Sequence, residues 1–187
     1  MKKVLAALFI TVISVGQFAL AQVKKTDASQ SEWVAETLKK MTLREKIGQM
    51  MVMPLNGEFA NVNSEKFREM RRQIEESHVG GFTLFRGEAN SIAVLTNEAQ
   101  KLAKIPLFFS ADYERGLRMQ LRTGTPFTTN MGVAAAGDVQ AAYNQGRIIC
   151  EEMRAIGGNW LFAPVADINN NPDNPVINIR SFGADPQ

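Results

Sequence analysis

Short apolar segments alternate with amphipathic segments along most of the chain. Residues 49–55, 80–86, 106–111 and 160–166 are short and almost wholly apolar, which is typical of buried parallel strands. Each of the first three is followed by a stretch with apolar residues at helical spacing. The order strand–helix, repeated three times and followed by a fourth strand buried on both faces, predicts an α/β fold with a parallel sheet.

Capping signals and apolar stripes support the helices between these strands. Ser64, Asn90 and Asp138 are the expected N-cap residues, and the glycine pair 157–158 is expected to end the last helix. The stripe expected to be buried along that helix comprises Val139, Ala142, Tyr143, Gly146, Ile149, Met153 and Ile156. Cys150 borders this stripe and is interpreted as a small buried residue.

Four such strands fit two folds, a doubly wound open sheet or the first half of a (β/α)8 barrel. No Gly-rich phosphate motif (GxGxxG or GxxxxGK[ST]) follows any predicted strand, which removes the main support for a nucleotide-binding doubly wound fold. A whole barrel needs about 250 residues. The sequence therefore predicts the N-terminal half of a TIM-type barrel, incomplete, over residues 32–187.

The first residues predict an export signal. The basic pair Lys2-Lys3 precedes an apolar run and a small-x-small cleavage site before Gln22, so residues 1–21 are interpreted as a signal peptide. A membrane anchor is the alternative. However, a membrane span needs about 20 apolar residues, and Gly16 and Gln17 interrupt this apolar run. The product is expected to be periplasmic or secreted, with no stable membrane association after cleavage.

The mature chain is expected to begin with a flexible segment, because residues 22–31 are polar and aperiodic. Apolar residues at helical spacing then predict a helix over residues 32–41. A capping box formed by Thr42 and Glu45 predicts a second, shorter helix before the first strand.

Composition and charge exclude several classes of protein. The 21 Lys and Arg exceed the 19 Asp and Glu by two, and removal of residues 1–21 takes away two lysines and no acids, which leaves a net charge of zero. A neutral chain has no basic footprint for nucleic acid. The single cysteine excludes an intrachain disulfide. No His/Cys/Asp cluster has ligand spacing, so neither a metal ion nor an organic cofactor is expected.

Polar side chains follow the predicted strands, where a barrel has its functional face. These residues are Arg86, Asp112, Glu114, Asp167, Asp173 and Arg180. Asp112 and Arg180 suit a neutral, hydroxyl-rich ligand such as a sugar, because a carboxylate accepts hydroxyl hydrogens and a guanidinium donates to hydroxyl oxygens. Ion pairs or caps that order the loops are the alternative at this point.

Two blocks of sequence resemble a known family. The stretch APVADINNNPDNPVINIRSFGADPQ, residues 163–187, looks like the signature of glycoside hydrolase family 3. The stretch IPLFFSADYERG, residues 105–116, resembles a second block of that family. The segments MTLREKIGQMMV and GGFTLFRG fit the same pattern, so the resemblance extends over residues 33–187.

The resemblance implies a retaining β-glycosidase whose partner is a carbohydrate substrate. It implies that Asp112 and Arg180 bind the sugar at the non-reducing end. The nucleophile and the acid/base are expected after Gln187, so no catalytic residue is assigned and the 187-residue chain alone is expected to be inactive. β-N-acetylhexosaminidase is the favoured activity. β-Glucosidase, an inactive carbohydrate-binding fragment and a truncated gene product are the alternatives.

Overall fold

A computed structural model describes residues 28–58 and 61–186, and the chain divides into two compact units after Lys40. In the first unit, the described residues form helix α2 (Ala28–Lys40). The helix begins earlier than predicted, so the expected flexible segment does not reach residue 31. The predicted signal peptide lies outside the described residues. No described helix has the length and apolar character needed to cross a membrane.

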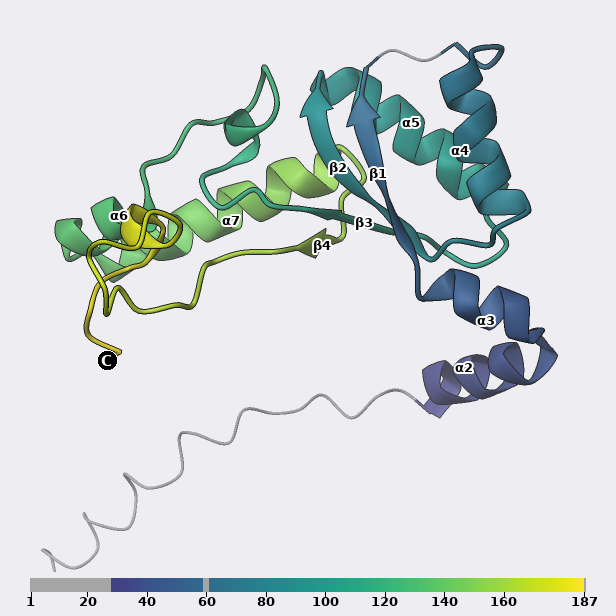
Figure 1. Ribbon diagram of the computed structural model, residues 1–187, viewed down its shortest axis with the longest axis horizontal. Coiled ribbons are helices and arrows are strands. Elements are labelled where there is room, and N and C mark those ends of the chain that lie inside the picture. Colours follow the sequence, from purple (N-terminus) through teal and green to yellow (C-terminus); the bar gives the residue numbers. More distant parts are fainter. Residues whose placement is uncertain (1–27, 59–60, 187) are drawn as a thin grey trace, which may run out of the picture. The chain divides into compact units, whose positions relative to one another are not determined.

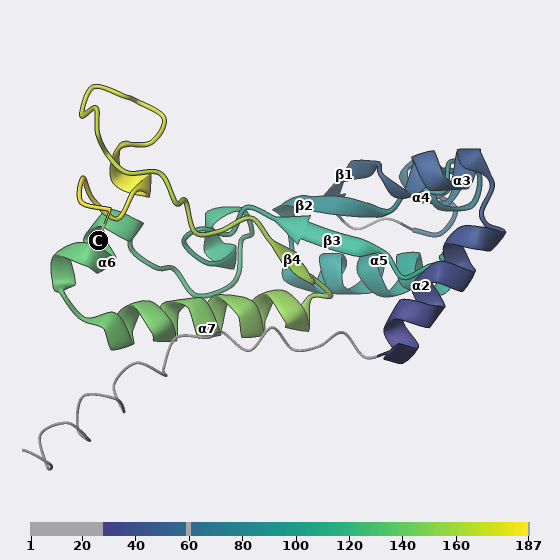
Figure 2. The same ribbon diagram turned by 90° about the horizontal axis from the view of Figure 1, so that it is seen from below.

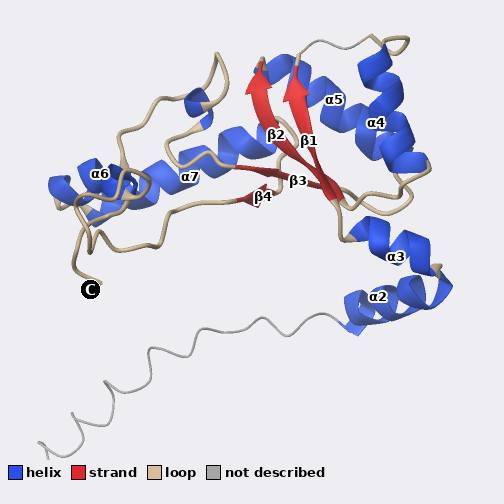
Figure 3. Cartoon of the chain, in the orientation of Figure 1, coloured by secondary structure: helices blue, strands red, loops and turns tan. Residues whose placement is uncertain are grey.

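The second unit contains a parallel sheet (Figure 3). Its strands are β1 (Val52–Gly57), β2 (Gly81–Gly87), β3 (Phe108–Ala111) and β4 (Trp160–Leu161). They lie in the order β1-β2-β3-β4, and every neighbouring pair is parallel. Each strand therefore pairs with the next one along the chain, as successive right-handed βα units require. The predicted α/β fold with a parallel sheet is confirmed.

Helices precede and connect these strands. They are α3 (Leu43–Gln49), α4 (Glu65–Glu75), α5 (Ala89–Leu102), α6 (Asn130–Ala136) and α7 (Val139–Ala155), with short 3-10 turns η1 (Leu117–Met119) and η2 (Asn178–Arg180). The capping box of Thr42 and Glu45 is present at the start of α3. Ser64 and Asp138 cap α4 and α7 as predicted.

The predicted cap at Asn90 is wrong. Helix α5 follows Glu88, which makes no side-chain capping bond. The backbone N–H of Glu88 donates to the carbonyl of Gly57 at 3.0 Å, so the contact with the end of β1 leads the chain directly into the helix. Helix α6 was not predicted at all, because its seven residues are mostly small and show no helical periodicity.

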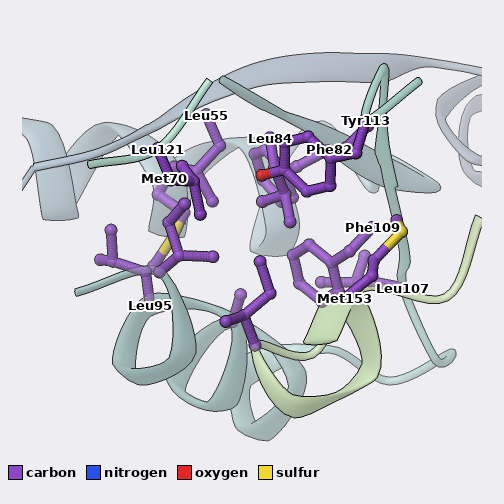
Figure 4. Packing of buried hydrophobic residues seen from close by; sticks show 14 of the residues in the cluster. Leu55, Met70, Phe82, Leu84, Leu95, Leu107, Phe109, Tyr113, Leu121 and Met153 are labelled. Atoms are coloured by element: carbon purple, nitrogen blue, oxygen red, sulfur yellow. The ribbon is translucent and has the colours of Figure 1, made fainter. Parts of the chain in front are cut away.

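The hydrophobic core lies between one face of the sheet and helices α4 and α5, with the C-terminal turns of α7 (Figure 4). Strand residues on this face are buried, and they meet the apolar faces of the helices. The main members are Leu55, Phe82, Leu84 and Phe109 from the strands and Phe67, Met70, Ile74, Ile92, Leu95 and Ala99 from the helices. Full burial of one such large side chain contributes about 1.5–3 kcal/mol.

Helix α7 is buried only along its C-terminal half. Ile149 and Met153 lie in the core, whereas Val139 and Tyr143 are exposed by 84% and 65%. Cys150 is also exposed, so its expected burial is wrong. The sheet supports only the last turns of α7, and the short α6 is the element beside its first turns (Figures 1 and 2). The apolar stripe along α7 is therefore longer than the part of the helix that the described residues bury.

The fourth strand also differs from its prediction. It pairs with β3 only at Trp160 and Leu161, and Trp160 is 44% exposed. The rings of Phe108 and Trp160 lie 5.4 Å apart, and those of Trp160 and Phe162 lie 5.0 Å apart. Burial on both faces was expected from the apolar run, but β4 is the edge of the described sheet and its second face has no cover there.

Tyr113 carries a buried hydroxyl with no hydrogen-bond partner among the described residues. Burial raises the pKa of this hydroxyl well above its usual value, so the group remains neutral. A buried polar group without a partner costs stability relative to an apolar group of the same shape.

Replacing Tyr113 with phenylalanine should therefore leave the free energy of unfolding unchanged or raise it by about 1 kcal/mol. Denaturant unfolding of the chain measures this value. Tyr143→Phe, on the exposed side of α7, is the matched control and should have no effect. A loss of more than about 1 kcal/mol in Tyr113→Phe would show that the hydroxyl is bonded in solution.

Candidate functional site

The candidate site lies where strands β3 and β4 end. Asp112 follows β3 directly, and Arg180 belongs to η2 in the long loop after β4. Helix α6 packs against η2, as Figure 1 shows for the yellow C-terminal segment. In α/β folds the carboxyl edge of the sheet is where loops assemble ligand sites.

Arg180 is held by Glu114 in a two-pronged ion pair. Its Nε donates to Glu114 Oε2 at 3.1 Å, and its Nη2 donates to Oε1 at 2.7 Å. The Glu114 side chain is 6% exposed, whereas that of Arg180 is 41% exposed. Two parallel charge-assisted bonds fix the plane of the guanidinium as well as its position. The pair joins the loop after β3 to the loop after β4.

Asp112 and Arg180 were predicted to bind one sugar together, but Glu114 is the residue that pairs with the arginine. Glu114 was a candidate in the sequence without an assigned partner. The hydrogen bonds and charge of Glu114 raise the pKa of Arg180, and the charges of Asp112 and Asp167 act in the same direction. One guanidinium thus stands among three carboxylates. In the sequence, Glu114 lies two positions after Asp112, and alternate residues of an extended chain point to the same side. This spacing was the sequence signal that Glu114 belongs to the same site as Asp112.

The loop that carries Arg180 is closed at its base by Ser181. This buried hydroxyl lies 2.7 Å from the carbonyl oxygen of Asp167 and 2.9 Å from that of Gly183, and it accepts a bond from the N–H of Gly183. The N–H of Asn169 donates to the carbonyl of Gly183 at 2.8 Å. These contacts bring the two ends of the loop together, and they place Arg180 beside the end of β3.

The remaining candidates lie elsewhere on the same unit. Arg86 lines a separate cavity of about 620 Å³ with Glu88 and Arg122, near the ends of β1 and β2. Asp173 is exposed in a turn in which its N–H donates to the Asn171 side chain. The structure brings neither Arg86 nor Asp173 to the ion pair. Among the described residues, no group of three His, Cys, Asp or Glu side chains could hold a metal ion.

The arrangement leaves hydrogen-bonding groups for a ligand. Arg180 has five guanidinium N–H groups, of which two bond Glu114 and a third donates to the carbonyl of Val176 at 3.1 Å. Within the described residues two N–H groups remain, on a side chain that is partly exposed. Asp112 adds a half-buried carboxylate that can only accept. Arg180 therefore orders the loops, as the alternative supposed, and still has donors for a hydroxyl-rich ligand.

Removing the Arg180 side chain would leave the buried carboxylate of Glu114 without its ion-pair partner. We expect Arg180→Ala to lower the free energy of unfolding by about 1–3 kcal/mol, because Glu114 loses its partner but stays buried. The double variant Arg180→Ala/Glu114→Gln should recover at least half of that loss, because a neutral amide costs less to bury. Denaturant unfolding measures both.

Arg147→Ala is the matched control, since it breaks an exposed ion pair with Glu151 and should cost less than about 0.5 kcal/mol. If Arg180→Ala costs no more than this control, the pair with Glu114 contributes nothing to stability.

Comparison with known proteins identifies the family. The sequence profile of the "Glycosyl hydrolase family 3 N terminal domain" matches residues 42–187. The chain is 35% identical over 153 residues to a beta-N-acetylglucosaminidase/beta-glucosidase from Cellulomonas fimi, covering 82% of this chain and 26% of that protein. It is 30% identical over 149 residues to a periplasmic beta-glucosidase from Salmonella typhimurium, covering 79% of this chain and 18% of that protein.

The fold matches as well. A solved structure of a beta-glucoside phosphorylase bound to 2FGlc has a TM-score of 0.76 and 29% sequence identity, covering 86% of this chain and 28% of that chain. The chain thus spans about a quarter of the length of these relatives, or less. Its four parallel strands and its partial match to larger members of the family agree with the predicted incomplete barrel. The chain belongs to glycosyl hydrolase family 3, and it corresponds to the N-terminal domain of that family.

Proposed function

We propose that the chain is the N-terminal part of a retaining β-glycosidase, which hydrolyses O-glycosyl bonds, and that Asp112 and Arg180 bind the non-reducing-end sugar. The observation that carries this proposal is the Arg180 guanidinium, which Glu114 holds in a fixed plane beside the end of β3. The two N–H groups that bond no described residue can donate to neighbouring hydroxyl oxygens of one sugar ring. Asp112 accepts hydrogens from hydroxyl groups of the same ring.

The electrostatics of the site favour the chemistry of glycoside cleavage. The carboxylates of Asp112, Glu114 and Asp167 all act on the guanidinium of Arg180, so this group of four side chains has more acidic than basic members. Positive charge develops on the sugar ring in the oxocarbenium-like transition state. Fixed negative charge nearby stabilises that state more than the neutral ground state, and this difference is what lowers the barrier.

The preferred substrate in this proposal is a β-linked N-acetylhexosaminide, with a β-glucoside second. The name of the Cellulomonas fimi relative combines both activities. Transfer to phosphate instead of water is a further candidate, because the structural relative is a beta-glucoside phosphorylase. Turnover of an aryl glycoside with and without added phosphate separates hydrolysis from phosphorolysis.

Export of the protein is part of the same proposal. The predicted signal peptide at residues 1–21 supports it, and the Salmonella relative is named as periplasmic. The resemblance to the family implies that the nucleophilic aspartate, a Lys-His pair and the acid/base follow the segment that ends at residue 187. We therefore assign sugar binding, and no bond-breaking step, to the residues of this chain.

In a glycosidase that contains this domain, Asp112→Ala should raise KM and lower kcat together. Hydrogen bonds from sugar hydroxyls to a carboxylate strengthen in the transition state, so kcat/KM should fall by about 10–100-fold. Steady-state kinetics on an aryl β-N-acetylglucosaminide measure the change. Glu98→Ala, which removes a half-buried carboxylate on α5 that pairs with Lys101, is the control and should leave both constants unchanged. An unchanged kcat/KM in Asp112→Ala refutes the binding role.

The 187-residue chain alone should show no turnover of aryl β-glycosides, because the proposal assigns it no nucleophile. A fluorogenic assay tests this expectation, with buffer as the negative control and a complete family 3 glycosidase as the positive control. Clear hydrolysis would contradict the assignment of catalysis to later residues. Equally, a coding sequence that continues past residue 187 without a Lys-His motif and a later strand-end aspartate would contradict the glycosidase proposal.

A further inference from the structure

Helix α6 brings one buried amide to the backbone of Arg180. Asn130 is the first residue of α6 and is 3% exposed. Its Nδ2 donates to the carbonyl oxygen of Arg180 at 2.7 Å. Thr129 caps the helix, since its hydroxyl accepts the N–H of Gly132 at 3.2 Å. The Asn130 side chain is therefore not used to cap its own helix, and its amide is directed at the loop after β4.

Arg180 is thus fixed at both ends by different parts of the fold. Glu114, from the loop after β3, holds the guanidinium, and Asn130, from α6, holds the main-chain carbonyl. Both side chains are almost wholly buried. They also line the same cavity of about 330 Å³, together with Phe182. Figure 2 shows the C-terminal loop beside α6.

The two contacts have different consequences for the arginine. The bond to Glu114 supplies charge, and it holds the tip of a side chain with several rotatable bonds. The bond from Asn130 fixes the η2 turn from which that side chain starts. If the turn moves, Glu114 cannot follow because it is buried beside β3, and the two-pronged geometry is lost even though both charges remain.

We infer that Asn130 is a positioning residue for Arg180. It sets the backbone of η2 so that the guanidinium keeps its plane, and so that the two N–H groups without a described partner keep their direction. This inference rests on the proposed sugar-binding role of Arg180 and adds a residue outside both sequence blocks that resemble the family. Asn130 touches no substrate in this scheme. It acts through the arginine, so its loss should change the order of the Arg180 side chain more than the stability of the fold.

The test uses the whole 187-residue chain and the NMR signal of the Arg180 Nε–H group. Exchange of this hydrogen with water is slow when the group is bonded and shielded. Asn130→Ala and Asn130→Asp should each accelerate the exchange at least about tenfold; the aspartate keeps the shape of the side chain but removes the donor. Val133→Ala, a buried change in the same helix, is the control and should leave the exchange rate within about twofold.

Several outcomes would overturn the inference. Unchanged exchange in both Asn130 variants would do so, as would an equal effect in Val133→Ala. If both Asn130 variants unfold while Val133→Ala stays folded, the role of Asn130 is structural and the inference also fails.

A second measurement separates this inference from the proposed function. N-acetylglucosamine, and then glucose, are added at millimolar concentration to the unmodified chain while the Arg180 signal is followed. A shift that disappears in Asn130→Asp supports both proposals. No shift with either sugar, combined with accelerated exchange in the Asn130 variants, contradicts sugar binding and leaves the positioning role standing.

Discussion

The ion pair between Glu114 and Arg180 is the contact on which the candidate site depends. A carboxylate as buried as that of Glu114 is costly unless a cation and hydrogen bonds compensate it. The compensating cation is 66 residues further along the chain, so burial of Glu114 requires the loop after β4 to return to the end of β3. Two side chains hold the loop in this position. Ser181 closes the base of the loop, and Asn130 bonds the loop to α6.

The sheet determines where the two loops start. Asn159 accepts the N–H of Phe109 at 2.8 Å and donates to the carbonyl of Leu107 at 3.1 Å, so a side chain just before β4 extends the pairing with β3. Thr83 and Ser110 join β2 to β3 through hydroxyl groups 2.9 Å apart. Because these contacts set the stagger of the strands, they also set which loop residues meet at the carboxyl edge. In this way ordinary strand pairing brings Asp112, Glu114 and Arg180 to one place.

Burial is distributed unevenly across the unit. The face of the sheet that carries α4 and α5 is densely apolar, whereas Phe108, Trp160 and Phe162 are partly exposed on the opposite face. The loops at the carboxyl edge are held instead by polar contacts, such as the Glu152 carboxylate, which accepts the N–H of Thr125 at 3.0 Å and its hydroxyl at 2.5 Å. The apolar layer provides the rigid support, and the polar contacts orient the side chains of the site.

The sequence was enough to predict the four strands in order, the helices other than α6, the caps at Ser64 and Asp138, and the place of Asp112 at the end of β3. These features depend on the period of apolar residues and on neighbours within a few positions, so local patterns are enough to predict them. The family blocks added the family itself. The pairing of Glu114 with Arg180, and the bond from Asn130 to the same loop, could be seen only in the folded chain. Only the tertiary structure showed that β4 and the first turns of α7 are exposed. The partner of a loop residue and the burial of an apolar face depend on which distant segments of the chain lie beside them, and a local sequence pattern carries no information on those segments.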